Sequence, residues 1–244
     1  MTPLPRRNMS RLIWSGAFTA LGIAALVALG VWQLHRLAWK EALLDAISSR
    51  VHAPPVAPPP TAQWSRLDPS DYEYRHVRVE GSFEPGKQAL VFRNLSSPRG
   101  PYGGVGYLVM APLRLADGSA ILINRGFAPQ ELRESPRIAA PASAVVTGLM
   151  RSPEARTLFT PADDPAKGEW FTRDPAAIAA ALNVNDAAPF TIDADASGDL
   201  PEGGETILDF PNNHLSYALT WFGLAIALGG VFAAFVLKTL RERP

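Results

Sequence analysis

Two long apolar runs lie near the ends of the chain, and neither contains a charged side chain. The first covers residues 12–34 and the second residues 215–237. A helix rises about 1.5 Å per residue, so each run reaches about 34 Å, slightly more than the hydrocarbon thickness of a bilayer. We therefore predict two transmembrane helices. The first run has no clear small-residue cleavage site, which favours a retained span over a signal peptide.

Between these runs the pattern of apolar and polar positions changes three times. A helical period continues from residue 37 to about residue 49, and five prolines within residues 54–60 then favour an extended spacer. From residue 63 onward, alternating or short apolar segments predict a β-rich domain. The expected strands cover residues 74–80, 88–93, 106–115, 119–124, 145–150 and 190–192.

Turn and cap residues refine this prediction. The segment 116–118 (Ala-Asp-Gly) predicts a hairpin between two of the strands, and Asp174 is a suitable N-cap for a helix over residues 175–182. The expected fold class is therefore an α+β membrane protein, with two transmembrane helices flanking a β-rich exported domain. Its expected segments are an N-terminal tail (1–11), a span (12–34), a helical extension with a Pro-rich linker (35–62), the domain (63–211), a second span (212–237) and a C-terminal tail (238–244).

Small residues recur at every fourth position in both spans. Gly16, Ala20, Ala24 and Ala28 form one such series, and Ala225, Gly229 and Ala233 form the other. Small side chains let helices approach closely in lipid, so these series predict the faces on which the spans pack. The alternative is that Ala and Gly are simply abundant here.

Charge gives the expected orientation, although the net charge of the chain is zero. Arg6, Arg7 and Arg11 precede the first span, and Lys238, Arg241 and Arg243 follow the second. The positive-inside rule then predicts cytoplasmic termini and an exported central domain. Only eleven residues precede the first span, too few for a transit peptide, so we expect a bacterial inner membrane and a periplasmic domain.

Composition and missing motifs exclude several classes of function. The chain has no cysteine, which excludes disulfides, thiolate zinc sites and a cysteine nucleophile, and its charge balance argues against a nucleic-acid binder. Nucleophile-elbow, zinc-helix and Walker-type patterns are absent from the sequence. We therefore expect no catalytic or metal-binding residues and no enzymatic activity; a membrane-tethered periplasmic enzyme is the disfavoured alternative.

Two histidines stand at the outer ends of the spans. His35 follows the first span and His214 precedes the second, and an imidazole is a common ligand of haem iron. The alternative is an interfacial polar residue, with Asn212 or Asn213 capping the helix. A third feature, residues 124–126 (Asn-Arg-Gly), ends a predicted strand, where it indicates either a turn with an ion pair or an anion or docking contact.

Four ordered motifs resemble the surfeit locus protein 1 family. They are residues 30–40 (GVWQLHRLAWK), residues 74–81 (YRHVRVEG), residues 111–113 (APL) with 123–129 (INRGFAP), and residues 212–215 (NNHL) with Tyr217, Thr220 and Trp221. Their order and spacing resemble the family across nearly the whole chain. The family consists of assembly factors for cytochrome c oxidase with two membrane helices around an exported domain.

The resemblance implies a function and a site. It implies binding of haem a and its insertion into the catalytic subunit of the oxidase, with that subunit and haem a synthase as expected partners. The family's candidate haem ligand corresponds to His214, whereas His35 falls at a position that varies. The resemblance also implies a structural role for Asn124, Arg125 and Gly126. A cofactor-free scaffold that stabilises an oxidase assembly intermediate remains the alternative, and an absorption spectrum would discriminate between them.

Overall fold

The structure is a computed structural model that describes residues 6–135, 138–206 and 211–241. It divides into two compact units, residues 1–46 with 209–244 and residues 47–208. Two long helices dominate the first unit, α1 (Arg6–Val51) and α4 (His214–Arg241). Both are long and apolar enough to cross a membrane and so indicate a two-pass membrane protein. The predicted helical extension to about residue 49 is confirmed by the end of α1 at Val51.

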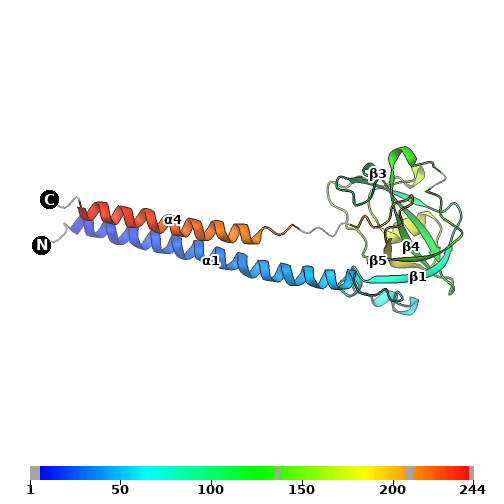
Figure 1. Cartoon of the computed structure of the whole chain (residues 1–244), viewed down its shortest axis with the longest axis horizontal. Helices are drawn as coiled ribbons and strands as arrows, with labels where there is room; N and C mark the ends of the chain where they lie inside the picture. Colours follow the sequence, from blue (N-terminus) through cyan, green and yellow to red (C-terminus); the bar gives the residue numbers. More distant parts are fainter. Residues whose placement is uncertain (1–5, 136–137, 207–210, 242–244) are drawn as a thin grey trace. The chain divides into compact units, whose positions relative to one another are not determined.

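The helices α1 and α4 run antiparallel, side by side (Figure 1). A side chain at Gly16 would meet the ring of Phe232, and one at Gly30 would lie 2.5 Å from the ring of Phe222. Gly30 is buried, as are Ala218 and Ala225 of α4. The absent side chains of glycine therefore make room for the phenylalanine rings of the other helix.

The predicted small-residue face of the first span is wrong beyond its first member. Ala20, Ala24 and Ala28 are exposed, whereas the less exposed positions of α1 include a series spaced alternately three and four apart, at 16, 19, 23, 26, 30 and 33. Four residues of an α-helix turn through 400°, so a strict four-residue series rotates about 40° off the contact face at each step. Alternating spacings stay on that face. In α4, Ala225 and Gly229 lie on it and Ala233 is exposed.

The second unit contains a seven-stranded mixed sheet. Its strands are β1 (His76–Phe83), β2 (Ala89–Leu95), β3 (Gly104–Arg114), β4 (Ala120–Pro129), β5 (Ser143–Arg151), β6 (Glu169–Trp170) and β7 (Ala187–Ala194). The order is β1-β5-β7-β4-β3-β2-β6, and β1 also pairs with β3. Five strands thus close into a ring, and β2 and β6 extend it. The β4–β7 and β2–β6 pairs are parallel, and the other pairs are antiparallel.

Both faces of β4 are covered, which explains why eight of its ten residues are buried. Ile121 and Ile123 join the cluster inside the ring with Phe190 and Ile192. Ala120 and Leu122 face the other way and join a second cluster with Ile178 of α3 (Pro175–Ala181). Alternate residues of one strand therefore serve two cores.

Most predicted elements of the domain are confirmed. The β3–β4 hairpin turns at residues 116–118, and the Asp174 side chain accepts hydrogen bonds from the amides of Ala176 and Ala177 at the start of α3. Five short elements were not predicted, because they carry too few residues to show a period; one is the 3-10 helix η2 (Gln130–Leu132). The other four are β6, α2 (Pro69–Tyr72) and the 3-10 helices η1 (Thr61–Arg66) and η4 (Pro165–Lys167).

Candidate functional site

The first residue of α4, His214, is joined to α1 by a side-chain hydrogen bond. Its Nδ1 atom lies 2.7 Å from Oε1 of Gln33, 181 positions earlier in the sequence. Gln33 falls on the contact face of α1, three residues after Gly30. The close approach at Gly30 and Phe222 brings these polar side chains within reach, so helix packing and the hydrogen bond depend on each other.

This contact assigns different roles to the two ring nitrogens of His214. An amide oxygen only accepts hydrogen bonds, so Nδ1 of His214 carries the proton and donates it to Gln33. In the neutral ring Nε2 then holds the lone pair, and it has no hydrogen-bond partner among the described residues. A histidine whose Nδ1–H donates to an oxygen while Nε2 stays free has the arrangement usual for a metal ligand.

The other residues expected near this site are placed differently from one another. Asn212 contributes a buried side-chain oxygen, Oδ1, that has no partner among the described residues. His35 is exposed and lies two positions after Gln33, which turns it about 200° away from the face that meets α4. The structure therefore brings Gln33, Asn212 and His214 into one region of the helix pair but does not bring His35 to His214.

The prediction that the Asn-Arg-Gly segment ends a strand is wrong, because β4 continues to Pro129. Gly126 has a φ of 133°, and a Cβ atom there would collide with the backbone of Glu202 and Gly203. Phe127 and Glu202 exchange two backbone hydrogen bonds of 2.8 Å beside it. Glycine is thus required where the 202–203 segment crosses β4.

Arg125 also departs from the predicted ion pair. Its Nη1 donates to the carbonyl oxygen of Ile138 at 2.6 Å, and its guanidinium lies 5.7 Å from the ring centre of Phe83. No carboxylate pairs with it among the described residues. Burial lowers the pKa of Arg125 without a compensating acid. Arg125 therefore fastens the segment before β5 to the sheet.

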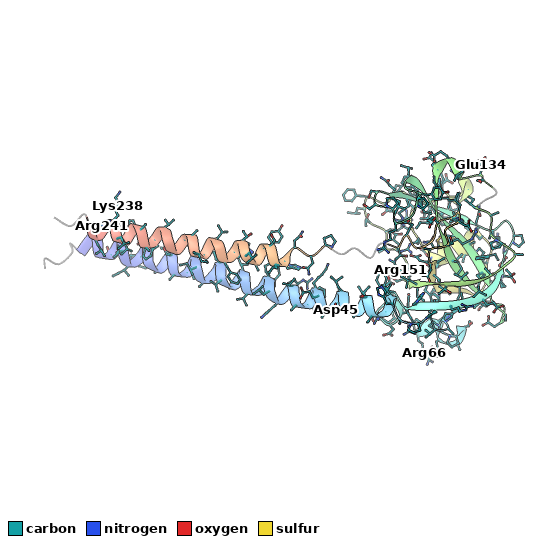
Figure 2. The ribbon with its side chains drawn as sticks, in the orientation of Figure 1. Asp45, Arg66, Glu134, Arg151, Lys238 and Arg241 are labelled. Atoms are coloured by element: carbon teal, nitrogen blue, oxygen red, sulfur yellow. The ribbon has the colours of Figure 1, made fainter. Side chains whose placement is uncertain are left out.

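Asn124 points to the opposite face, into a buried charge cluster around Asp193 (the Asp193 cluster). The Asp193 carboxylate is only 5% exposed and accepts hydrogen bonds from four side chains. The donors are Asn124 Nδ2 (2.9 Å), Arg173 Nη1 (2.8 and 3.1 Å), Arg151 Nη1 (3.2 Å) and Thr206 Oγ1 (2.9 Å). The cluster ties β4, β5 and β7 to the segments around residues 173 and 206; Arg151 is labelled in Figure 2.

Further acids balance the arginines of this cluster. Glu73 accepts from Arg151 at 2.8 Å, and Glu154 lies 3.7 Å from Arg173 and 2.7 Å from Arg93. Burial would raise the pKa of Glu154, but its hydrogen bonds and charge interactions with Arg93 and Arg173 together outweigh burial and hold that pKa below its usual value. A cavity of about 190 Å³ adjoins these side chains. Because its charges are mutually paired, the cluster is best suited to holding strands together.

Comparison with known proteins gives the same family as the motifs. The model of the SURF1 family matches residues 20–226. The chain belongs to the SURF1 family. It is 32% identical over 241 residues to mouse (Mus musculus) surfeit locus protein 1, covering 91% of this chain and 76% of that protein. It is 33% identical over 218 residues to the human (Homo sapiens) protein, covering 82% and 70%, and 33% identical over 244 residues to a Drosophila melanogaster SURF1-like protein, covering 92% and 78%.

Neither Gln33 nor Asp193 of this SURF1 family member is predicted as a site residue by the sequence patterns. Gln33 lies within the first motif, but a lone glutamine at a span end shows no partner in the sequence. Gln33 is a polar residue on the face of α1 that packs against α4. This position could have pointed to a contact, but only if the contact face of α1 had been predicted correctly. Asp193 directly follows a predicted strand, and only the sheet pairing brings it to Arg151 and Arg173.

Proposed function

We propose that this SURF1 family member is an assembly factor for cytochrome c oxidase that binds haem a through His214 and assists its insertion into the catalytic subunit. The observation that carries the proposal is that Nε2 of His214 has no partner among the described residues, while Nδ1–H is held by Gln33 at 2.7 Å. An imidazole presented in this way donates its lone pair to iron. No enzymatic step is part of the proposal.

The residues around His214 fit a haem group. Haem needs an axial nitrogen ligand, apolar surroundings for its ring and polar partners for its carboxyl groups. His214 supplies the nitrogen, and the exposed side chains of Trp32, Leu215 and Tyr217 lie within one helical turn of Gln33 or His214. The unpartnered Oδ1 of Asn212 is an acceptor for a protonated group. When bound, haem would supply an iron centre to be handed over, and the protein would hold and release it.

The decisive experiment is an absorption spectrum of the full chain produced together with haem a synthesis. We expect a haem a spectrum for the wild-type protein, its loss or a strong change in His214→Ala, and a smaller effect of His35→Ala at a similar depth of α1. An identical spectrum in His214→Ala would refute the ligand assignment. No haem in the wild-type protein would favour the cofactor-free scaffold.

Gln33 supplies a test that does not need haem. In protein labelled with ¹⁵N-histidine, we expect the resonances of His214 to report a proton on Nδ1. Gln33→Ala removes the acceptor, so the ring should move toward a mixture of the two neutral forms. Gln33→Glu keeps an oxygen acceptor and should retain the proton on Nδ1. A wild-type ring protonated on Nε2 would contradict the assignment.

The proposed location is a bacterial inner membrane with both termini in the cytoplasm and the β-domain in the periplasm. Support comes from the basic residues that follow the second span; Lys238 and Arg241 stand at the C-terminal end of α4 (Figure 2). Reporter fusions after Arg243 should be active only in the cytoplasm and fusions near Asp164 only in the periplasm. Opposite results at either position would reverse the topology.

A further inference from the structure

A cavity of about 380 Å³ borders the apolar cluster inside the ring of strands (the Arg125 cavity). Phe83, Ile123 and Val146 belong to that cluster and line the cavity. Residues of the segment 195–201 also line it. Sites for small molecules commonly have volumes of about 300–1,000 Å³ and mostly apolar walls. The cavity therefore has the size and the surface of a small-ligand site.

A bulge in β4 directs the Arg125 side chain to this cavity. At residues 125–126 the strand has one residue more than the facing part of β3. Bulges commonly change the direction of a side chain beside a binding site. Arg125 follows Ile123 by two positions and lines the same cavity, and its guanidinium lies 5.7 Å from the ring centre of Phe83. The strand thus presents a cation to an apolar cavity.

The charge of Arg125 is not compensated within the described domain. Its Nη1 donates to the carbonyl oxygen of Ile138, and this is one of five N–H groups of a guanidinium. Burial lowers its pKa, and no described carboxylate offsets burial. Among the described residues of the domain, every other arginine that is not exposed pairs with a carboxylate: Arg93, Arg114, Arg133, Arg151 and Arg173.

The uncompensated cation and its surroundings select the chemistry of a ligand. An anion would supply the missing charge, and the parallel N–H donors of a guanidinium match the two oxygens of a carboxylate. Two acids, Asp195 and Asp199, also line the cavity; neither pairs with Arg125, and Asp195 lies 2.9 Å from Nε2 of His76. These acids would repel a second negative charge, so they favour a monocarboxylate over a phosphate or a dicarboxylate.

We propose that the Arg125 cavity binds a small monocarboxylate with an apolar body. The carboxylate contacts Arg125, and the apolar body packs against Phe83, Ile123 and Val146. This role is the anion contact that the Asn-Arg-Gly pattern left open as an alternative. The cavity is lined by residues of the β-domain unit, so the proposal does not depend on haem binding at His214.

The first test measures the binding of three probes to the full-length chain in a neutral detergent. Phenylacetate has an apolar ring and one carboxylate, phenylacetamide has a neutral amide in place of the carboxylate, and phenylmalonate has a second carboxylate. We expect NMR saturation transfer from the protein to phenylacetate, with a saturable titration. Phenylacetamide should bind at least about tenfold more weakly, because it cannot form the charged hydrogen bonds. Phenylmalonate should also bind more weakly, because the two acids repel it.

The second test locates the phenylacetate site with variants. Arg125→Gln removes the charge and should weaken binding at least about tenfold. Arg125→Lys keeps the charge without the parallel donors and should weaken binding less. Ala144→Leu adds bulk to the cavity wall and should also weaken binding, while it leaves both partners of the Arg125–Ile138 contact in place. The matched control is Arg114→Gln, outside the cavity, which should bind phenylacetate within about twofold of the wild-type chain.

Several outcomes would overturn the proposal. One is a wild-type chain that shows no saturable binding of phenylacetate. Others are equal binding of phenylacetate and phenylacetamide, tighter binding of phenylmalonate, and unchanged binding in a folded Arg125→Gln or Ala144→Leu variant. Circular dichroism shows whether each variant is folded, and Ala144→Leu decides the question if Arg125→Gln does not fold. The haem spectrum tests the proposed function separately, so the two proposals can fail independently.

Discussion

The helix pair and the β-domain are held together by different kinds of contact. Between α1 and α4, glycines leave room for phenylalanine rings of the other helix. A side-chain hydrogen bond between Gln33 and His214 also joins the two helices. In the domain, two apolar clusters surround β4, and Asp193 binds two arginines beside them. The stability of the helix pair depends on close packing at glycines. The stability of the domain depends on apolar packing and also on buried charges that are paired with each other.

This difference explains why His214 and Asp193 should respond differently to substitution. His214 donates a single neutral hydrogen bond, so its loss leaves no charge without a partner. Asp193 neutralises arginines that are themselves largely buried, and removing one partner of a buried charge cluster costs much more than the cluster contributes as a whole. We therefore expect a substitution of His214 to remove function while the protein still folds, and a substitution of Asp193 to destabilise the fold itself.

The largest expected effect comes from Asp193→Ala. Arg173 and Arg151 would keep their charges in a buried environment without the carboxylate, so the free energy of unfolding of the domain should fall by about 3–5 kcal/mol. Chemical unfolding of the full chain in detergent, followed by tryptophan fluorescence, measures this. Asp195→Ala is the control, because that carboxylate is 47% exposed. A loss below about 1 kcal/mol would show that the Asp193 cluster is not needed for the fold.

A smaller loss is expected from Gly126→Ala. The substitution forces alanine to a φ of 133° and drives its Cβ into the backbone at Glu202, so we expect a loss of at least about 2 kcal/mol. Gly86→Ala is the matched control, since Gly86 also has a positive φ but its Cβ would enter open space, and it should cost about 1 kcal/mol. Equal losses in the two variants would mean that the 202–203 crossing contributes nothing.

The helix pair should be disturbed by Gly30→Leu without unfolding the domain. A side chain there meets the Phe222 ring, separates the backbones and removes many small dispersion contacts. Ala24→Leu is on the exposed face and should have little effect. Spin labels on α1 and α4 should report a larger separation in Gly30→Leu only. Equal separation in both variants would restore the four-residue series as the contact face.

The smallest expected effect is a pH dependence from His76. Burial lowers its pKa, but hydrogen bonds to Asp195 (2.9 Å) and to the carbonyl of Ala53 outweigh burial and raise the pKa above 6.5. The contribution of this group to stability is therefore complete below pH 6.5 and is lost as the pH rises through the raised value. The pair is partly exposed, so the change should stay below about 1 kcal/mol.

Unfolding at pH 5.5 and 8.0 measures the effect of His76, and His76→Gln is the comparison. The variant keeps a polar side chain that does not titrate, so its stability should change less between the two pH values. A wild-type protein that becomes more stable between pH 6.5 and 8 would contradict the sign.

Sequence patterns predicted more of the fold than of the site. Both spans, the β3–β4 hairpin and the Asp174 cap follow from local signals, such as run length, turn residues and a cap two and three positions before the amides it binds. The prediction of the contact face of α1 was wrong because a series of small residues does not show which side of the helix packs against another helix. His214 was selected from its position and from the family motif, whereas Gln33 lacked any local signal.

The family, the two apolar helices and the β-rich composition of the segment between them could be predicted, because each depends on residues that lie close together in the chain. Folding of the whole chain was needed to show that Gln33 contacts His214, that Asp193 binds Arg151 and Arg173, and that position 126 requires glycine. The paired residues are 181 positions apart for His214 and Gln33, 42 for Asp193 and Arg151, and 20 for Asp193 and Arg173. At such separations the pairing is set by which helix faces pack and which strands are neighbours, and neither is encoded in a local pattern.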